Sequence, residues 1–89
     1  MNKYLIISGR VQGVGFRYAA QQKAQTLNLV GWVQNQTDGT VKLEVEGKSN
    51  SIDAYMEALK SGFNPFIRVN HIEEKTSQQH KGYDTFSIK

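Results

Sequence analysis

A short stretch near the N-terminus, residues 7–17, combines the groups that an oxyanion site needs. It reads Ile-Ser-Gly-Arg-Val-Gln-Gly-Val-Gly-Phe-Arg, so that Gly13 and Gly15 stand close together and Arg17 follows them. Backbone N–H groups at the start of a helix bind anions, and glycines let an oxyanion come close to the main chain. A guanidinium group matches the oxygens of a phosphate or a carboxylate. The stretch is therefore predicted to be a phosphate-binding loop with Arg17 at its end.

The charges of the chain are spread unevenly, in a way that favours an anionic partner. Residues 1–37 hold four basic residues and no Asp or Glu, a net charge of +4, whereas residues 38–89 carry −1. Carboxylates close to an anion site would repel the ligand. The asymmetry indicates a negatively charged ligand without identifying it.

Length and composition narrow the class of protein. With 89 residues, of which 38% are hydrophobic, the chain is expected to form a single domain over residues 1–89 with one modest core. The absence of cysteine rules out disulfides, thiolate nucleophiles and cysteine metal sites. The apolar run Tyr4–Ile7 is too short for a signal sequence or a membrane span. A soluble cytoplasmic protein without membrane partners is the expectation.

The first half of the chain predicts a strand, a helix and a hairpin. The apolar run at residues 4–8 is typical of a central strand. Apolar residues at helical spacing from Phe16 onward predict a helix of about 11 residues, and Asn28, which tolerates the left-handed conformation, is placed to end it. Residues 30–36 read as a second strand. Asp38-Gly39 is a strong hairpin signal before a half-buried third strand at residues 41–46.

The second half predicts another helix and two more strands. Apolar residues at positions 52, 55, 56 and 59 share one helical face, Gly62 ends the run, and the N-cap candidates are Ser49, Asn50 and Ser51. Residues 68–75 read as a fourth strand, and residues 86–88 alternate as a short closing strand. The order is that of an α+β, ferredoxin-like split βαβ sandwich, with two helices on one face of an antiparallel sheet.

This topology brings a second polar residue toward the loop. Strands 1 and 2 of a split βαβ unit run in the same direction with strand 3 between them, so their C-terminal ends lie at one end of the sheet. The glycine loop leaves strand 1 there, and Asn35 stands near the end of strand 2. Strands separated by one neighbour are roughly 10 Å apart. A phosphate on the loop and a water held by the Asn35 amide could bridge that distance.

Two stretches of the chain closely resemble the signature motifs of the acylphosphatase family. They are residues 7–17 and Gly-Trp-Val-Gln-Asn at residues 31–35, the second followed by Gly39, Val41 and Gly47. The resemblance covers nearly the whole chain, although Gln34 stands where many family members carry a basic residue. It implies hydrolysis of the carboxyl–phosphate bond of acyl phosphates, which gives a carboxylate and inorganic phosphate.

The resemblance also implies a role for each site residue. Arg17 and the loop N–H groups would hold the phosphoryl oxygens, while Asn35 would orient the attacking water. No covalent intermediate, metal or cofactor is expected. The implied partners are a small acyl phosphate and, as product-like ligands, inorganic phosphate or sulfate, bound by a monomer. The N–H groups in question are those of Gln12, Gly13, Val14, Gly15 and Phe16.

Two alternatives belong to other functional classes. RNA-recognition domains share this fold class, and residues 13–18 partly match their RNP1 motif. However, Val14 stands where that motif has its first stacking aromatic residue. The predicted third strand offers no aromatic residue and two acids, so no nucleic-acid partner is expected. The other alternative is a regulatory or carrier domain that binds a phosphorylated metabolite without turning it over. Turnover of benzoyl phosphate in the presence of a chelator separates the enzyme from both alternatives.

Overall fold

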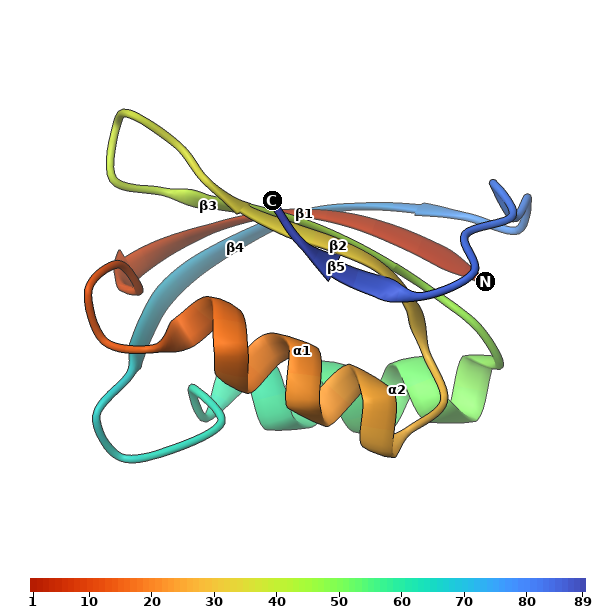
Figure 1. Cartoon of the computed structure of the whole chain (residues 1–89), viewed down its shortest axis with the longest axis horizontal. Coiled ribbons are helices and arrows are strands. Elements are labelled where there is room, and N and C mark those ends of the chain that lie inside the picture. The colour runs from red at the N-terminus through yellow and green to blue at the C-terminus, as the bar shows by residue number, and fades with distance from the viewer.

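The computed structural model describes all residues 1–89 as a five-stranded sheet with both helices on one face, as Figure 1 shows. This is the ferredoxin-like α+β sandwich that the sequence predicts. In chain order the elements are β1 (Asn2–Arg10), α1 (Phe16–Thr26), β2 (Val30–Asn35), β3 (Val41–Glu46), α2 (Ser49–Lys60), β4 (Arg68–Ser77) and β5 (Phe86–Ile88).

The sheet has the order β4-β1-β3-β2-β5, so that β3 lies between β1 and β2 as predicted. The four longer strands pair antiparallel, and the short β5 is added at the edge, parallel to β2, which makes the sheet mixed. Since β1 and β2 each pair antiparallel with β3, their C-terminal ends lie at the same end of the sheet. The loop between β1 and α1 and the β2–β3 hairpin meet there (Figure 1).

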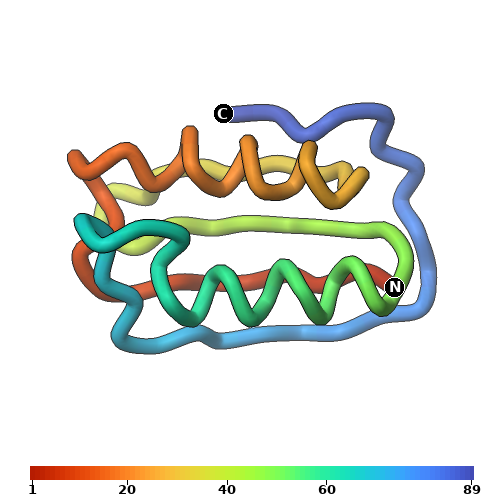
Figure 2. Tube along the Cα trace, turned by 90° about the horizontal axis from the view of Figure 1, so that it is seen from below, coloured from red at the N-terminus to blue at the C-terminus, as the bar shows by residue number.

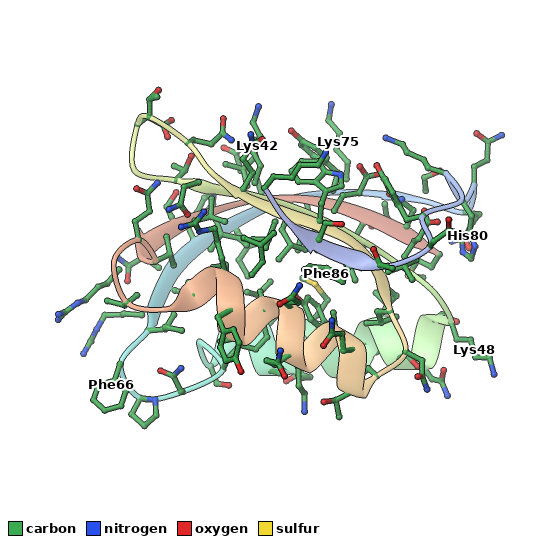
Figure 3. The ribbon with its side chains drawn as sticks, viewed as in Figure 1. Lys42, Lys48, Phe66, Lys75, His80 and Phe86 are labelled. Atoms are coloured by element: carbon green, nitrogen blue, oxygen red, sulfur yellow. The ribbon has the colours of Figure 1, made fainter.

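The core fills the space between the sheet and the two helices. Alternate residues of the central strands point into it, among them Leu5, Ile7 and Leu43, which are fully buried. Figure 3 shows Phe86 of β5 between the sheet and the helices. The helices lie side by side and run in opposite directions (Figure 2). The hydroxyl of Tyr55 in α2 donates a 3.0 Å hydrogen bond to the carbonyl of Ala20 in α1 and so joins them.

The start of α2 differs from the sequence prediction. Ser49, Asn50 and Ser51 were the expected N-cap residues, but the helix begins at Ser49 with Lys48 in the N-cap position, and no side chain caps it. The Asn50 amide oxygen accepts a hydrogen bond from the N–H of Ser51 instead. The ends of the helices are as predicted, because Asn28 (φ 57°) and Gly62 (φ 80°) adopt left-handed conformations directly after them.

The third strand is more deeply buried than its alternating pattern indicates. Glu44 and Glu46, on the face away from the helices, are each only 2% exposed because the segment before β5 covers them. Asn2 donates to both carboxylates, and the backbone N–H groups of Lys81, Gly82 and Tyr83 donate to Glu46. Burial raises the pKa of each glutamate. These hydrogen bonds, together with those that Lys81 Nζ and the Tyr83 hydroxyl donate to Glu44, outweigh burial and leave both pKa values below the usual range.

Neither helix has the length and the hydropathy that crossing a lipid bilayer would demand.

Candidate functional site

The loop between β1 and α1 has the backbone of an anion cradle. Gly13 (φ 75°) and Gly15 (φ 78°) are left-handed, a conformation that glycine adopts without strain. The N–H groups of residues 12–15 donate to no backbone carbonyl. Gly15 is the N-cap of α1, no side chain caps the helix, and its first turn holds no acidic residue. The loop therefore presents unpaired donors together with the positive end of the helix dipole.

The side chain of Gln12 fixes the loop to the β2–β3 hairpin. Its Nε2 donates to the carbonyl of Gln36 at 2.8 Å and to that of Thr40 at 2.9 Å. The hairpin is closed between the same two residues, since the N–H of Gln36 donates to the carbonyl of Thr40. The sequence predicts a role for the backbone N–H of Gln12 alone, and it does not predict this side-chain contact with the hairpin. It holds the loop at a set distance from the end of β2.

Arg17 lies in the first turn of α1, where the helix dipole disfavours a cation. No acidic side chain forms an ion pair with it, because the ion pairs of the chain belong to Lys3, Lys60 and Lys81. Its Nη1 donates a long hydrogen bond, 3.3 Å, to the backbone oxygen of Lys89. The guanidinium group thus keeps donors for a ligand.

Asn35 is the last residue of β2 and lies directly opposite Val41 of β3. Its Oδ1 is shielded from solvent and has no hydrogen-bond partner. A buried polar atom without a partner costs roughly 1–3 kcal/mol, so such atoms are rare away from functional sites. Asn35 therefore offers an acceptor that a bound donor would satisfy.

One hollow of about 230 Å³ brings these groups together. Gly13, Gly15 and Arg17 line it from the loop and the helix, and Asn35 lines it from the end of β2. This is the convergence that the strand order predicts. Gln12 and Val14 do not line this hollow: the side chain of Gln12 points to the hairpin, and Val14 lines a different hollow, so a role for their backbone N–H groups stays a prediction.

The walls of the hollow include residues that the sequence analysis did not assign to the site. Val11 is a buried apolar wall that belongs to the core, and Tyr18 and Ile88 form an outer rim, with Tyr18 64% exposed. The side chain of Phe16, whose backbone N–H was predicted to belong to the site, is a second buried apolar wall. The position of Ile88 follows from the parallel pairing of β5 with β2, which no short-range pattern signals. No carboxylate, imidazole or amine lines the hollow. Nowhere in the chain do three or more His, Asp or Glu side chains cluster as ligands for a metal ion.

Comparison with known proteins identifies the family of this chain. The family model described as Acylphosphatase matches residues 3–88. An acylphosphatase of Bacillus subtilis is 44% identical over 84 residues, which are 94% of this chain and 91% of the relative. The chain belongs to the acylphosphatase family.

Solved structures of acylphosphatases agree with this membership. The crystal structure of the acylphosphatase from Bacillus subtilis superposes with a TM-score of 0.91, at 44% identity, over 99% of this chain and 98% of the other. That from Coxiella burnetii gives a TM-score of 0.90 at 33% identity, over 99% and 90% of the two chains. The chain is accordingly an acylphosphatase enzyme, a hydrolase of acyl phosphates.

Proposed function

We propose that this acylphosphatase hydrolyses its substrates by direct attack of water on phosphorus, without a metal ion or a phosphorylated enzyme. The observation that carries the proposal is the shared hollow, in which unpaired donors of the glycine loop and Arg17 lie opposite the unpaired acceptor of Asn35. Donors suit the phosphoryl oxygens, and an acceptor suits a water molecule. A single site thus holds both reactants of a hydrolysis.

The donors would stabilise the charge that develops on phosphorus. The N–H groups of residues 12–16 and the Arg17 guanidinium bind the three phosphoryl oxygens, replacing the hydration of the phosphate with fixed dipoles and one fixed charge. Phosphoryl transfer depends mainly on positioning and charge stabilisation, and a carboxylate is a good leaving group. The loop and Arg17 therefore supply most of what this reaction requires.

Asn35 would orient the nucleophile. A water that donates one hydrogen bond to Oδ1 directs its lone pair at phosphorus, and it supplies the partner that this buried oxygen lacks. The bond between phosphorus and the water oxygen forms as the bond between phosphorus and the acyl oxygen breaks. The acyl group leaves as a carboxylate. With no carboxylate, imidazole or amine in the hollow, the proton of the water passes to a phosphoryl oxygen of the substrate.

The position of bond cleavage can be tested with labelled water. Benzoyl phosphate is hydrolysed in water enriched in oxygen-18 with a chelator present, and the products are separated. The proposal requires turnover unaffected by the chelator and the label in inorganic phosphate alone. Label in benzoate would mean attack at the carbonyl carbon, and a mass increase of the protein by one phosphoryl group would mean a covalent intermediate. Near-normal turnover by Arg17→Ala would equally contradict the role of the guanidinium group.

The same proposal includes a monomeric enzyme that acts in the cytoplasm. A chain without cysteine loses nothing in a reducing compartment. The large hydrophobic side chains that it exposes, Tyr18, Phe66 and Ile88, gather around the candidate site rather than on a separate face that would fit a second copy. Sedimentation velocity at micromolar and higher concentration tests the oligomeric state.

A further inference from the structure

A second hollow, of about 410 Å³, adjoins the phosphate-binding loop on its other side. Arg10, Val14 and Arg68 line it together with Pro65 and Phe66. Val14 belongs to this hollow, whereas its neighbours Gly13 and Gly15 line the first one, so the loop is the wall between the two. A ligand with its phosphoryl group on the loop can therefore extend into the second hollow.

Two unpaired guanidinium groups face this second hollow. Arg10 ends β1 and Arg68 begins β4, and the two residues lie directly opposite each other in the antiparallel pair. Side chains at opposite positions share one face of a sheet, and like charges there destabilise the pair. No carboxylate forms an ion pair with either residue, since all ion pairs of the chain involve lysines. An anion between the two guanidinium groups would remove their repulsion.

The backbone brings the two arginines together at a point where it needs glycine. Gly9 has a φ of 136°, and a Cβ added there would collide with the backbone carbonyl of Arg68. A bulge between Ser8 and Gly9 shifts the register, so that Arg10 pairs with Arg68. Only glycine permits this close approach of β1 and β4. With Arg17, these residues are all the arginines of the chain, and all three line one of the two hollows beside the loop.

The second hollow also has an apolar side that suits an organic group. Phe66 is 77% exposed although it is large and hydrophobic. The turn that holds Phe66 is stabilised by a 2.9 Å hydrogen bond, which the backbone N–H of Phe66 donates to Oδ1 of Asn64. Figure 3 shows Phe66 at the end of the molecule where the loop lies. Two guanidinium groups beside an aromatic ring match an organic molecule that carries an anionic group.

The in-line geometry of the reaction places the acyl group on the side of Arg10 and Arg68. In an in-line displacement the leaving oxygen departs on the side of phosphorus opposite the attacking water. Asn35 would hold that water at the end of β2. In the sheet order, β1 and β3 lie between β4 and β2, so the opposite side is that of β4. Arg10 and Arg68 lie there.

We propose that Arg10 and Arg68 bind a carboxylate or phosphate group on the acyl part of the substrate. They thereby select acyl phosphates whose acyl part carries an anionic group over those whose acyl part is uncharged. This specificity rests on the proposed function, because it assumes that the phosphoryl group occupies the loop and that Asn35 holds the water.

The test compares substrates that differ only in that second group. The probes are 3-carboxybenzoyl phosphate, 3-phosphonobenzoyl phosphate and 3-carbamoylbenzoyl phosphate, whose 3-substituent is uncharged. The measured quantity is the ratio of kcat/KM for a probe with a charged 3-substituent to that for the carbamoyl probe. The ratio is expected to be about five- to twentyfold in the natural chain, since each exposed ion pair contributes up to about fivefold. It should fall toward one at about 0.5 M salt, and the two charged probes show which anion is preferred.

Substitutions assign the effect to residues. In Arg10→Gln/Arg68→Gln the ratio should drop to about one, and each single variant should retain part of it. The matched control is Lys48→Gln, which removes one exposed charge at the opposite end of the molecule (Figure 3) and should keep the natural ratio. Both arginines are exposed and repel each other, so the thermal unfolding temperature of the variants should be unchanged or slightly higher.

The outcomes distinguish this inference from the proposed function. A ratio near one in the natural chain, an unchanged ratio in the double variant or an equal loss in Lys48→Gln would overturn the inference while turnover itself persists. Hydrolysis of none of the three probes would instead contradict the proposed function. A ratio that depends on salt but not on the arginines would mean that the net charge of the protein selects the substrate.

Discussion

Replacing Asn35 by alanine should lower activity sharply without lowering stability. The structure accounts for both the loss of activity and the unchanged stability. Oδ1 of Asn35 is shielded and unpartnered, and such an atom costs about 1–3 kcal/mol, so its removal returns part of that cost. The lost contacts of a half-buried side chain offset some of the gain. The free energy of unfolding should therefore stay the same or rise by about 1 kcal/mol.

The expected loss of activity in Asn35→Ala follows from the position of the water. Without Oδ1 the nucleophile loses the acceptor that is proposed to position it, and a displacement of about 1 Å can cost a factor of about 100 in rate. We expect kcat for benzoyl phosphate to fall by about 100-fold or more, while the Kd of inorganic phosphate changes by less than about threefold because the loop and Arg17 are intact.

Three measurements check the prediction on the same protein: loss of benzoyl phosphate absorbance, phosphate titration and urea unfolding. Asn70→Ala is the matched control, because it removes an exposed amide from β4. A kcat within about threefold of the natural value would refute the role of Asn35 in positioning water. Weakened phosphate binding together with a stability loss of about 2 kcal/mol would reassign Asn35 to a structural role.

Three further substitutions test the elements that position the site. Gln12→Ala removes two hydrogen bonds to the hairpin, so urea unfolding should show a loss of about 1–2 kcal/mol, with weaker phosphate binding. Gly31→Ala should cost more than about 3 kcal/mol in the same assay, because the added Cβ would collide with the Glu44 carbonyl. Asn2→Ala should cost about 2 kcal/mol and make acid unfolding begin at higher pH.

The acid sensitivity has a definite direction. The folded-state pKa values of Glu44 and Glu46 lie below the ordinary value of a glutamate, so these groups bind protons less readily in the folded chain than in the unfolded chain. Their contribution to stability is complete above about pH 5 and is lost as the pH falls through the folded pKa values. Loss of the Asn2 amide raises both pKa values and moves this loss to higher pH. An acid unfolding midpoint unchanged by Asn2→Ala would contradict this reasoning.

The sequence predicts most of the candidate site because local signals and strand order agree. The glycine spacing and Arg17 identify the loop, Asp38-Gly39 locates the hairpin, and the split βαβ order brings the ends of β1 and β2 together. Asn35 could be placed beside the loop from that order alone. The residues that line the hollow agree with this placement, and their catalytic roles remain predictions.

What the sequence does not reveal depends on contacts between distant segments. An alternating strand shows which residues share a face, but it does not show that the segment before β5 buries Glu44 and Glu46. No local pattern indicates that the register of β1 with β4 places Arg68 opposite Arg10. The side-chain role of Gln12 depends in the same way on where the hairpin lies.

The most direct test of the central claim is a phosphate titration followed by amide NMR. The claim is that backbone N–H groups of the loop, with Arg17, hold the phosphoryl oxygens. The account predicts saturable shifts of the amide signals of Gly13, Gly15 and their neighbours from Gln12 to Arg17, with one common Kd that is lost in Arg17→Ala. Loop amides that stay unshifted at saturating phosphate, or shifts confined to another part of the chain, would contradict it.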